Sequence, residues 1–264
     1  MKKKLKRAAK IEKKNKEPRI LSLDYETSPQ KGYFFGSVWE TDIIKVIEDT
    51  SILCVGYRWD DGPIKIVGQD DFKGYKKGIL NDKALVEFFA PILKQADVVS
   101  AHNGDAFDIK IFNSRLLFHG LEPVPITKSF DTKKIARANF NLPSYKLDDI
   151  ARFLGIGQKL STYKQLWFDC EAGNEKAWKY MKKYCGMDVA LQYEVLKRVL
   201  PYAKQTGDFI FVNPEGITCP NPMCLSSYMT KSKTKIVKGG FKQQYQCQDC
   251  GSYFTNQKLV KISA

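Results

Sequence analysis

The sequence predicts an α/β fold, in which a mixed sheet is flanked by helices, followed by a small C-terminal β module. Between residues 19 and 202, short β-branched and apolar runs alternate with longer segments of helical spacing, as in a sheet covered by helices. The last fifty-odd residues contain four clustered cysteines and too few large apolar residues for a core. A metal ion is a common way to hold so small a segment together.

The individual elements follow from the length and spacing of the apolar runs. We expect strands, because the runs are short and rich in β-branched residues, at residues 19–25, 52–59, 64–67 and 97–101. Apolar residues recur every three or four positions in four other segments, which predicts helices at 82–95, 106–119, 144–155 and 174–200. Ser144 is the expected N-cap of the third helix. No fixed-period repeat is visible, which argues against a solenoid or propeller.

The charge of the chain favours an acidic partner. The 264 residues include 43 Lys and Arg against 29 Asp and Glu, a formal charge of +14, which favours nucleic acid or an anionic membrane surface. Residues 1–19 contain ten of the basic residues and only two Glu, whereas residues 20–207 are nearly neutral. We expect residues 1–18 to be a disordered basic tail, which either keeps the protein in solution or binds nucleic acid.

Membrane and secreted classes are disfavoured. No uncharged apolar run approaches the roughly 18 residues of a membrane-spanning helix, and Lys10 and Lys13 interrupt the place where a signal peptide would be apolar. The sequence therefore predicts an intracellular, cytoplasmic protein, located in the host cytoplasm if the chain is viral. Seven cysteines is an odd number, and reduced thiols are expected at the three scattered ones, Cys54, Cys170 and Cys185.

Four carboxylates and a tyrosine are the residues with candidate chemistry. Asp24 and Glu26 are two residues apart on an expected strand, so both side chains leave the same face. Asp108 begins an expected helix, and Asp188 lies on the last one, with Tyr184 one turn before it. Each signal alone has a plain structural explanation: an exposed sheet face, a helix cap and a surface pair.

Convergence of these carboxylates would require cations. Two like charges about 4 Å apart repel by on the order of 4 kcal/mol at an effective dielectric near 20. Hard oxygen ligands suit Mg²⁺ or Mn²⁺. Two such ions about 3.5 to 4 Å apart can activate a water and stabilise the departing oxygen in phosphodiester cleavage. The residues therefore indicate two-metal hydrolysis, provided that the fold brings them together.

Three segments carry a family resemblance. LDYET (23–27), HNGDAFD (102–108) and YCGMD (184–188) resemble the three exonuclease motifs of the DEDD superfamily of 3′-to-5′ exonucleases, which have a ribonuclease H-like fold. SYKLDDIARFLGI (144–156) is similar to the helix that precedes the third motif in that superfamily. Lys183 stands where a histidine would stand in one variant, and Tyr184 matches the tyrosine-type variant. The resemblance covers residues 19–202.

The resemblance implies roles for individual residues. Two Mg²⁺ or Mn²⁺ ions would be bound by Asp24, Glu26, Asp108 and Asp188, and Tyr184 would orient the attacking water. The terminal nucleotide would be contacted by Thr27, Asn103 and Phe107, although plain packing is an equal alternative for each of them. The implied reaction releases nucleoside monophosphates from the 3′ end of single-stranded nucleic acid, with DNA slightly favoured over RNA.

The C-terminal cysteines predict a zinc site. Cys219 and Cys224 are separated by four residues, and Cys247 and Cys250 by two, with 22 residues between the pairs, a spacing typical of a tetrahedral four-sulfur site. Two strand-like runs between the pairs are divided by Gly239 and Gly240, which indicates a hairpin. The segment resembles a zinc ribbon, particularly those attached to transposases and other DNA-handling enzymes. One structural zinc is expected, since four thiolates leave no open coordination position.

These observations predict three parts: a basic tail at 1–18, a ribonuclease H-like exonuclease domain at 19–206 and a zinc ribbon at 207–264. Lysines of the ribbon would hold a nucleic-acid backbone and its aromatic residues, Tyr228, Phe241, Tyr245 and Phe254, would stack on bases. The ribbon could instead pack on the nuclease or a partner protein. Two other functions stay open: a non-catalytic nucleic-acid-binding subunit of a replication or repair assembly, and an endonuclease on the same fold.

Overall fold

The computed structural model describes residues 19–36, 42–126, 128–203, 212–213, 216–237 and 240–256. The expected basic tail at 1–18 lies outside these residues. The expected boundary between nuclease and ribbon, at 206/207, lies outside them as well. Among the helices in these ranges, none has the length and apolar character needed to cross a bilayer.

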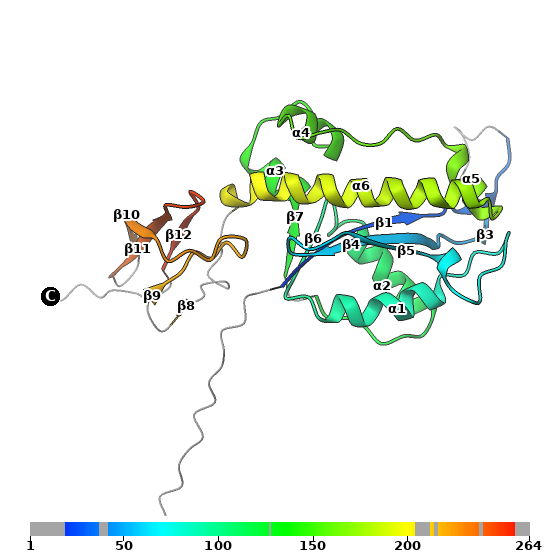
Figure 1. Ribbon diagram of the computed structural model, residues 1–264, viewed down its shortest axis with the longest axis horizontal. Helices are drawn as coiled ribbons and strands as arrows, with labels where there is room; N and C mark the ends of the chain where they lie inside the picture. The colour runs from blue at the N-terminus through cyan, green and yellow to red at the C-terminus, as the bar shows by residue number, and fades with distance from the viewer. Residues whose placement is uncertain are drawn as a thin grey trace, which may run out of the picture.

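A five-stranded mixed sheet forms the centre of the protein, in the order β5-β4-β1-β6-β7 (Figure 1). Strand β1 pairs antiparallel with β4 on one side and parallel with β6 on the other, and β7 extends the parallel part. The strands are β1 (Ile20–Thr27), β4 (Ile52–Trp59), β5 (Lys65–Gly68), β6 (Val98–Ala101) and β7 (Ser129–Asp131). Strand β1 is thus central: β6 pairs with its N-terminal residues Ile20–Ser22, whereas the pairing with β4 continues to Thr27.

Helices cover both faces of this sheet, which confirms the predicted fold class (Figure 1). One face packs on α1 (Lys83–Lys94) and α2 (Asp108–Phe118). The other face packs on α6 (Glu175–Val199), which runs alongside α3 (Thr132–Asn139), α4 (Leu147–Phe153) and α5 (Gln165–Glu171). Short 3₁₀ turns occur at η1 (Gln69–Asp71) and η2 (Leu200–Tyr202).

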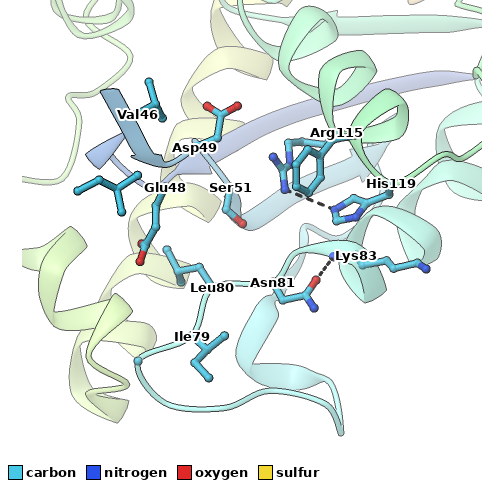
Figure 2. Close-up of a pocket in the computed structure, with 13 residues that line it drawn as sticks. Val46, Glu48, Asp49, Ser51, Ile79, Leu80, Asn81, Lys83, Arg115 and His119 are labelled. Atoms are coloured by element: carbon cyan, nitrogen blue, oxygen red, sulfur yellow. Dashed lines mark hydrogen bonds between the residues drawn. The ribbon is translucent and has the colours of Figure 1, made fainter. Parts of the chain in front are cut away.

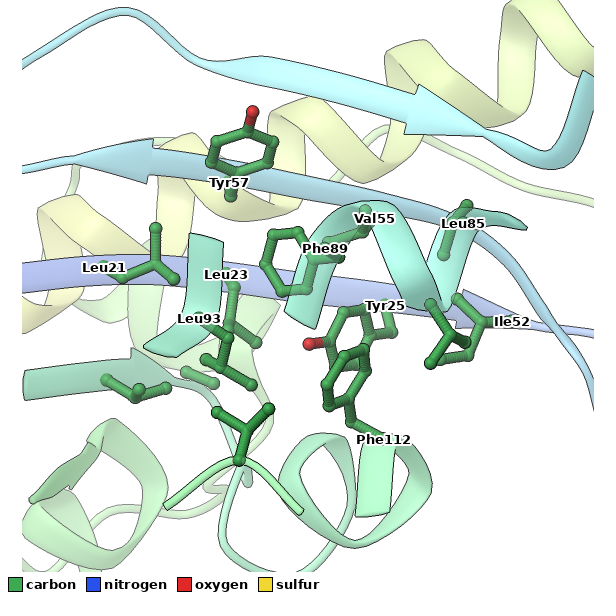
Figure 3. Packing of buried hydrophobic residues seen from close by; sticks show 14 of the residues in the cluster. Leu21, Leu23, Tyr25, Ile52, Val55, Tyr57, Leu85, Phe89, Leu93 and Phe112 are labelled. Atoms are coloured by element: carbon green, nitrogen blue, oxygen red, sulfur yellow. The ribbon is translucent and has the colours of Figure 1, made fainter. Parts of the chain in front are cut away.

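The hydrophobic core lies mainly between the sheet and the pair α1 and α2. Figure 3 shows alternate residues of β1, Leu21, Leu23 and Tyr25, pointing into this core. The ring of Tyr25 stacks on Phe112 of α2 and meets Phe89 of α1 edge to face, both at 5.8 Å between centroids. Because side chains alternate along a strand, the residues between these three must face α6 on the opposite side.

The remaining strands form three small sheets. Strands β2 (Lys31–Tyr33) and β3 (Lys45–Glu48) pair next to the main sheet. The C-terminal part contains the pair β8 (Val212–Asn213) and β9 (Gly216–Ile217). It also contains a three-stranded sheet of β10 (Met229–Val237), β11 (Gly240–Cys247) and β12 (Tyr253–Thr255). Strands β10 and β11 are the two arms of the predicted hairpin.

Helix boundaries agree with the sequence at α6 and differ at α4. Asn174 caps α6, since its side-chain oxygen accepts from the N–H groups of Lys176 and Ala177. Ser144, the predicted N-cap of the third helix, is not the cap, because that helix begins at Leu147 with Lys146 as N-cap. The Ser144 hydroxyl instead accepts from the Lys146 N–H at 3.3 Å. Such a turn over two residues competes with helix capping.

Helix α6 lies unusually close to the sheet at two glycines. A Cβ added at Gly56 of β4 would lie 2.9 Å from Cγ2 of Val189 and 3.0 Å from Sγ of Cys185. A Cβ added at Gly186 of α6 would lie 2.9 Å from Cδ1 of Ile66. The Cys185 thiol also donates to the carbonyl oxygen of Asp24 at 3.5 Å. These contacts fix the height and rotation of α6 above β1.

A methyl group at Gly56 should therefore destabilise the protein. We predict that Gly56→Ala lowers the free energy of unfolding by about 1–3 kcal/mol, because overpacking forces helix and sheet apart. The matched control is Gly74→Ala, whose added Cβ would meet no atom within 4 Å and should change stability by less than about 0.5 kcal/mol. Urea unfolding measures both, and equal stabilities of the two variants would contradict the close packing of α6.

Candidate active site

Three carboxylates far apart in the sequence converge above the C-terminal half of β1. Asp24 and Glu26 leave the face of β1 that is opposite to the Tyr25 ring, and Asp188 reaches them from α6. Ligand oxygens of these three residues all lie within 4.8 Å of one another. Glu26 and Asp188 are buried, with 9% and 1% of their surface exposed. Three of the four predicted carboxylates therefore lie together in the structure.

Asp108 lies beside this group and is held by the backbone of β1. It is the first residue of α2, and its Oδ1 accepts from the Tyr25 N–H at 3.1 Å. The residue is 2% exposed. Its charge acts on Asp24, whose pKa is raised by burial and then by Asp108, Glu26 and Asp188. The four predicted carboxylates thus influence one another electrostatically. Only three of them, Asp24, Glu26 and Asp188, have ligand oxygens within 4.8 Å of one another.

The carboxylate cluster favours a bound cation. Burial, reinforced by neighbouring carboxylates, raises the pKa of Glu26 to about 8, and burial raises that of Asp108 to about 7. Oδ1 of Asp188 is buried and has no hydrogen-bond partner among the residues that the structure describes. An unpaired buried carboxylate oxygen is costly. Oxygen ligands of this kind suit a divalent cation such as Mg²⁺ or Mn²⁺, so the donor set fits the implied metals.

Lys159 enters the cluster from the loop between α4 and α5. Its Nζ donates to Oδ2 of Asp188 at 2.5 Å and to Oη of Tyr184 at 3.2 Å. Burial disfavours the ammonium, but the Asp188 carboxylate outweighs it and holds the pKa of Lys159 above its usual value. The sequence did not reveal this lysine, because a Lys in a polar loop has the pattern of a solvated residue. The only indication in the sequence was the group of carboxylates itself, whose convergence would require a positive charge nearby.

Tyr184 lies one helical turn before Asp188, as predicted, and is 9% exposed. Its ring meets that of Trp167 edge to face, with 6.3 Å between centroids. Burial and the Asp188 carboxylate raise the pKa of Tyr184. The phenol is therefore neutral near pH 7 and can both donate and accept a hydrogen bond.

The loop before Asp108 is fixed by hydrogen bonds to α3 and its surroundings. The His102 ring contacts Oγ1 of Thr132 at 2.8 Å and the carbonyl oxygen of Tyr145 at 3.0 Å. The N–H of Asn103 donates to Oδ1 of Asp131 at 3.0 Å, the residue that also caps α3. Local hydrogen bonds thus hold His102, and Asp131 caps α3. These contacts fix the start of α2 and therefore the position of Asp108, its first residue.

Two of the three expected substrate contacts border the carboxylates. Phe107 directly precedes Asp108 and is 40% exposed. Thr27 directly follows Glu26 and lines a hollow of about 360 Å³ together with Trp167, Phe168 and three further residues, Ser28, Pro29 and Lys164. Asn103 adopts a left-handed backbone, with φ of 69°, in the loop described above. The aromatic residues of α5 were missed because helix α5 itself was not predicted.

A separate cavity of about 700 Å³ contains none of the four carboxylates (Figure 2). Arg115 and His119 of α2 line it, and both bind the buried Asp82 carboxylate that precedes α1, at 2.8 and 2.6 Å. Asp82 also accepts from the Ile52 N–H at 2.8 Å. This network joins α1, α2 and β4. It gives His119 a structural role.

A family model of the RNase H superfamily matches residues 40–200, more than half of the chain. The chain belongs to the RNase H superfamily. In fold it is similar to the family B DNA polymerase from the hyperthermophilic archaeon Pyrobaculum calidifontis, with a TM-score of 0.50 and 14% identity. That similarity covers 70% of this chain and 25% of the polymerase, so the chain spans about a quarter of the polymerase's length. No curated protein matches the sequence.

The RNase H-like fold expected from the motifs is therefore confirmed. The residues matched to the superfamily include Asp108, Tyr184 and Asp188, but they begin after β1, which carries Asp24 and Glu26. The superfamily fold supports nuclease activity and binding of nucleic acid in general. The four C-terminal cysteines also lie beyond the matched residues, and their site has to be judged from its own geometry.

The four cysteines of this RNase H superfamily member form one compact cluster. Their Sγ atoms all lie within 4.8 Å of one another, with Cys219 3.5 Å from Cys250 and Cys224 3.6 Å from Cys247. Four sulfurs at 2.3 Å from a tetrahedral zinc are about 3.8 Å apart. The cluster, which contains no disulfide, therefore fits a zinc ion, and with its small antiparallel sheet it is compatible with the predicted zinc ribbon.

Each cysteine pair sits on a turn that ends in a left-handed residue. Gly251 follows Cys250 with φ of 75°, and Leu225 follows Cys224 with φ of 49°. In each pair, the backbone N–H of the first cysteine donates to the carbonyl oxygen of a serine beyond the turn. Cys219 donates to Ser226 at 2.8 Å, and Cys247 donates to Ser252 at 2.9 Å. A leucine in this conformation is strained. The two turns thus present their thiols alike despite the longer spacing of the first pair.

We predict one zinc per chain, held by these thiolates. Cys247→Ser should release the zinc and unfold the C-terminal sheet, because binding of a structural zinc contributes about 10 to 16 kcal/mol in small modules. Cys170→Ala, which removes a buried thiol elsewhere, should keep the zinc. Elemental analysis of purified protein measures both, and full zinc content in Cys247→Ser would contradict the four-sulfur site.

Proposed function

We propose that the protein is a two-metal 3′-to-5′ exonuclease of the DEDD type, tyrosine variant, which releases nucleoside monophosphates from single-stranded nucleic acid. The convergence of Asp24, Glu26 and Asp188 at one site, with Tyr184 one turn away, carries this proposal. The resemblance of the three motifs supports the 3′-to-5′ direction. DNA is slightly favoured over RNA, because the ribbon resembles those of DNA-handling enzymes.

The carboxylates would hold two Mg²⁺ or Mn²⁺ ions, with Asp108 completing the set formed by Asp24, Glu26 and Asp188. The bound ions would supply an activated water and stabilisation of the departing oxygen. Tyr184, as a neutral phenol, would accept a hydrogen bond from this water and orient it. Burial of the carboxylates excludes competing solvent and strengthens every charge interaction in the site.

Lys159 has two successive tasks in this proposal. Before metal binding its ammonium offsets part of the burial that raises the pKa of Asp188. With a divalent cation bound at Asp188, the ammonium would move off the carboxylate, and its contact with the Tyr184 oxygen, 3.2 Å in this structure, would keep it at the site. There it can stabilise negative charge that develops on the substrate phosphate. The lysine thus competes with the metals for Asp188 and assists the reaction once they are bound.

The 3′ end of the nucleic-acid substrate would lie between the residues that border the carboxylates. Thr27, Asn103 and Phe107 contact the terminal nucleotide in this proposal. The aromatic residues beside Thr27, Trp167 and Phe168, offer flat surfaces on which a base can stack. Thr27 and Phe107 each lie next to a carboxylate in the sequence, and Trp167 and Phe168 line the adjacent hollow, so a phosphate between them would reach the metal site.

We propose the same division of the chain that the sequence predicts: a basic tail at 1–18, the exonuclease domain at 19–206 and the zinc ribbon at 207–264. The fold similarity to a DNA polymerase supports replication or repair proteins as partners. A cytoplasmic location, in the host if the chain is viral, follows from the sequence alone.

Removal of single carboxylates should abolish the activity. We predict that Asp24→Asn and Asp188→Asn lower the rate of mononucleotide release by at least about 10³-fold, and that Tyr184→Phe lowers it by about 10²-fold with nucleic-acid affinity retained. The assay compares 3′-labelled and 5′-labelled single strands of DNA and RNA with Mg²⁺. Glu87→Gln, an exposed carboxylate on α1, is the control and should retain full activity.

Two outcomes would contradict the proposal. Wild-type protein that leaves all strands intact with both Mg²⁺ and Mn²⁺ would show that the fold serves non-catalytic binding. Cleavage of a circular single strand, which has no end, would show an endonuclease. Laddered release from the 3′ label, together with an intact circle, is the expected result.

The competition between Lys159 and the metals gives a separate prediction. Lys159→Met removes the charge but keeps the length of the side chain, so half-maximal activity should occur at a lower Mg²⁺ concentration while the maximal rate falls by about 10- to 100-fold. Lys94→Met, an exposed lysine at the end of α1, is the matched control. Unchanged Mg²⁺ dependence and an unchanged maximal rate in Lys159→Met would show that the lysine is only a surface charge.

A further inference from the structure

A second cleft lies between the C-terminal end of α6 and the cysteine-rich sheet. Figure 1 shows this sheet beside the end of α6 at which η2 begins. The cleft has a volume of about 660 Å³. Lys197, Arg198 and Tyr202 line it from the nuclease side, and Gln244 and Tyr253 line it from β11 and β12. It shares no residue with the carboxylate site.

The lining residues combine positive charge with exposed aromatic rings. Tyr202 is 61% exposed and Tyr253 is 48% exposed. Lys197 pairs with Glu194 of its own helix at 2.6 Å, whereas Arg198 pairs with no carboxylate among the described residues. An arginine with a free guanidinium group binds a phosphate in a bidentate manner. Tyrosine rings provide stacking surfaces for unpaired bases.

The aromatic residues of the ribbon are of two kinds: some pack against each other, and others are exposed. Tyr245 and Phe254 are neighbours across β11 and β12, their rings stack on each other at 5.7 Å, and Phe254 is 3% exposed. The two rings therefore pack on each other; Phe254 is too buried to stack on a base, whereas Tyr245 is half-buried. Tyr253, the residue before Phe254 in the strand, points to the opposite face because side chains alternate. That face is the wall of the cleft.

Both walls are held in place by apolar contacts. Met223, in the turn of the first cysteine pair, packs against a cluster of the nuclease that includes Ile20, Tyr193 and Leu200. Asp249 precedes Cys250, which lines the cleft, in the sequence. Three exposed lysines of β10, Lys231, Lys233 and Lys235, extend the positive surface of the ribbon. The cleft is thus a formed, basic and aromatic site.

We propose that this cleft is a second binding site for single-stranded nucleic acid, which holds the strand at a distance from the carboxylates. Arg198 follows Asp188 by ten residues on α6, which is about 15 Å along the helix axis. A strand that occupies both sites must span several nucleotides. The link between the two sites rests on the proposed exonuclease function, whereas binding in the cleft depends only on Arg198, Tyr202 and Tyr253.

The test compares affinities of full-length variants for long and very short strands. Fluorescence anisotropy without added divalent metal measures binding of labelled DNA and RNA of about 12 and about 3 nucleotides. For the longer strand, Arg198→Ala should weaken binding by about 5- to 20-fold and lower the salt slope by about one. Tyr253→Ala should weaken it about tenfold at an unchanged slope. The shorter strand should lose affinity as well, because without a metal its binding depends on the same cleft side chains.

Lys179→Ala is the matched control, because it removes one exposed charge from α6 outside the cleft. Equal affinity losses in Lys179→Ala and Arg198→Ala would overturn the proposal, since charge alone would then explain binding. Unchanged affinity in both cleft variants would overturn it as well, as would a wild-type protein that binds neither DNA nor RNA at low salt. Zinc content and melting temperature of each variant establish that the ribbon stays folded.

The same variants separate the cleft from the exonuclease proposal. If Arg198→Ala and Tyr253→Ala lose affinity while the wild type cleaves nothing with Mg²⁺, the cleft is supported and the exonuclease fails. If all variants cleave and bind the long strand as the wild type does, the exonuclease stands and the cleft fails. The DNA and RNA strands identify which nucleic acid the cleft prefers.

Discussion

The contact between α6 and the central strands determines the geometry of the candidate site. Because Gly56 has no side chain, α6 can lie against β4, and the Cys185 thiol reaches the carbonyl oxygen of Asp24. Tyr184 and Asp188 flank Cys185 on the same helix, so the contact places both near the carboxylates of β1. A helix only slightly higher above the sheet would leave Asp188 out of reach of Glu26.

Convergence of carboxylates has an electrostatic cost that the fold itself does not remove. Burial raises the pKa values of all four groups, which means that the ionised forms are disfavoured in the protein alone. Lys159 offsets part of this charge, and Asp188 still keeps one buried oxygen without a partner in the described structure. The site is therefore arranged for a cation that binds more strongly than an ammonium does, as divalent metals do.

The sequence predicted those features that depend on local spacing. Asp24 and Glu26 share a face because strand side chains alternate, Tyr184 and Asp188 share a face because a helix turns every 3.6 residues, and cysteine spacing indicated the four-sulfur cluster. Features that depend on tertiary contacts were not predictable. Lys159 acquires its partner only when the loop before α5 folds over α6. Phe254 became an internal residue because it pairs with Tyr245 across two strands, a register that the sequence did not specify.

The most direct test is a count of metal ions at the carboxylates. Titration of the zinc-loaded protein with Mn²⁺, followed by electron paramagnetic resonance of the free ion, should show two bound Mn²⁺ per chain in the wild type and a loss of binding in Asp24→Asn and Asp188→Asn. Binding that is absent in the wild type, or equal in the wild type and both variants, would show that these carboxylates do not form a metal centre.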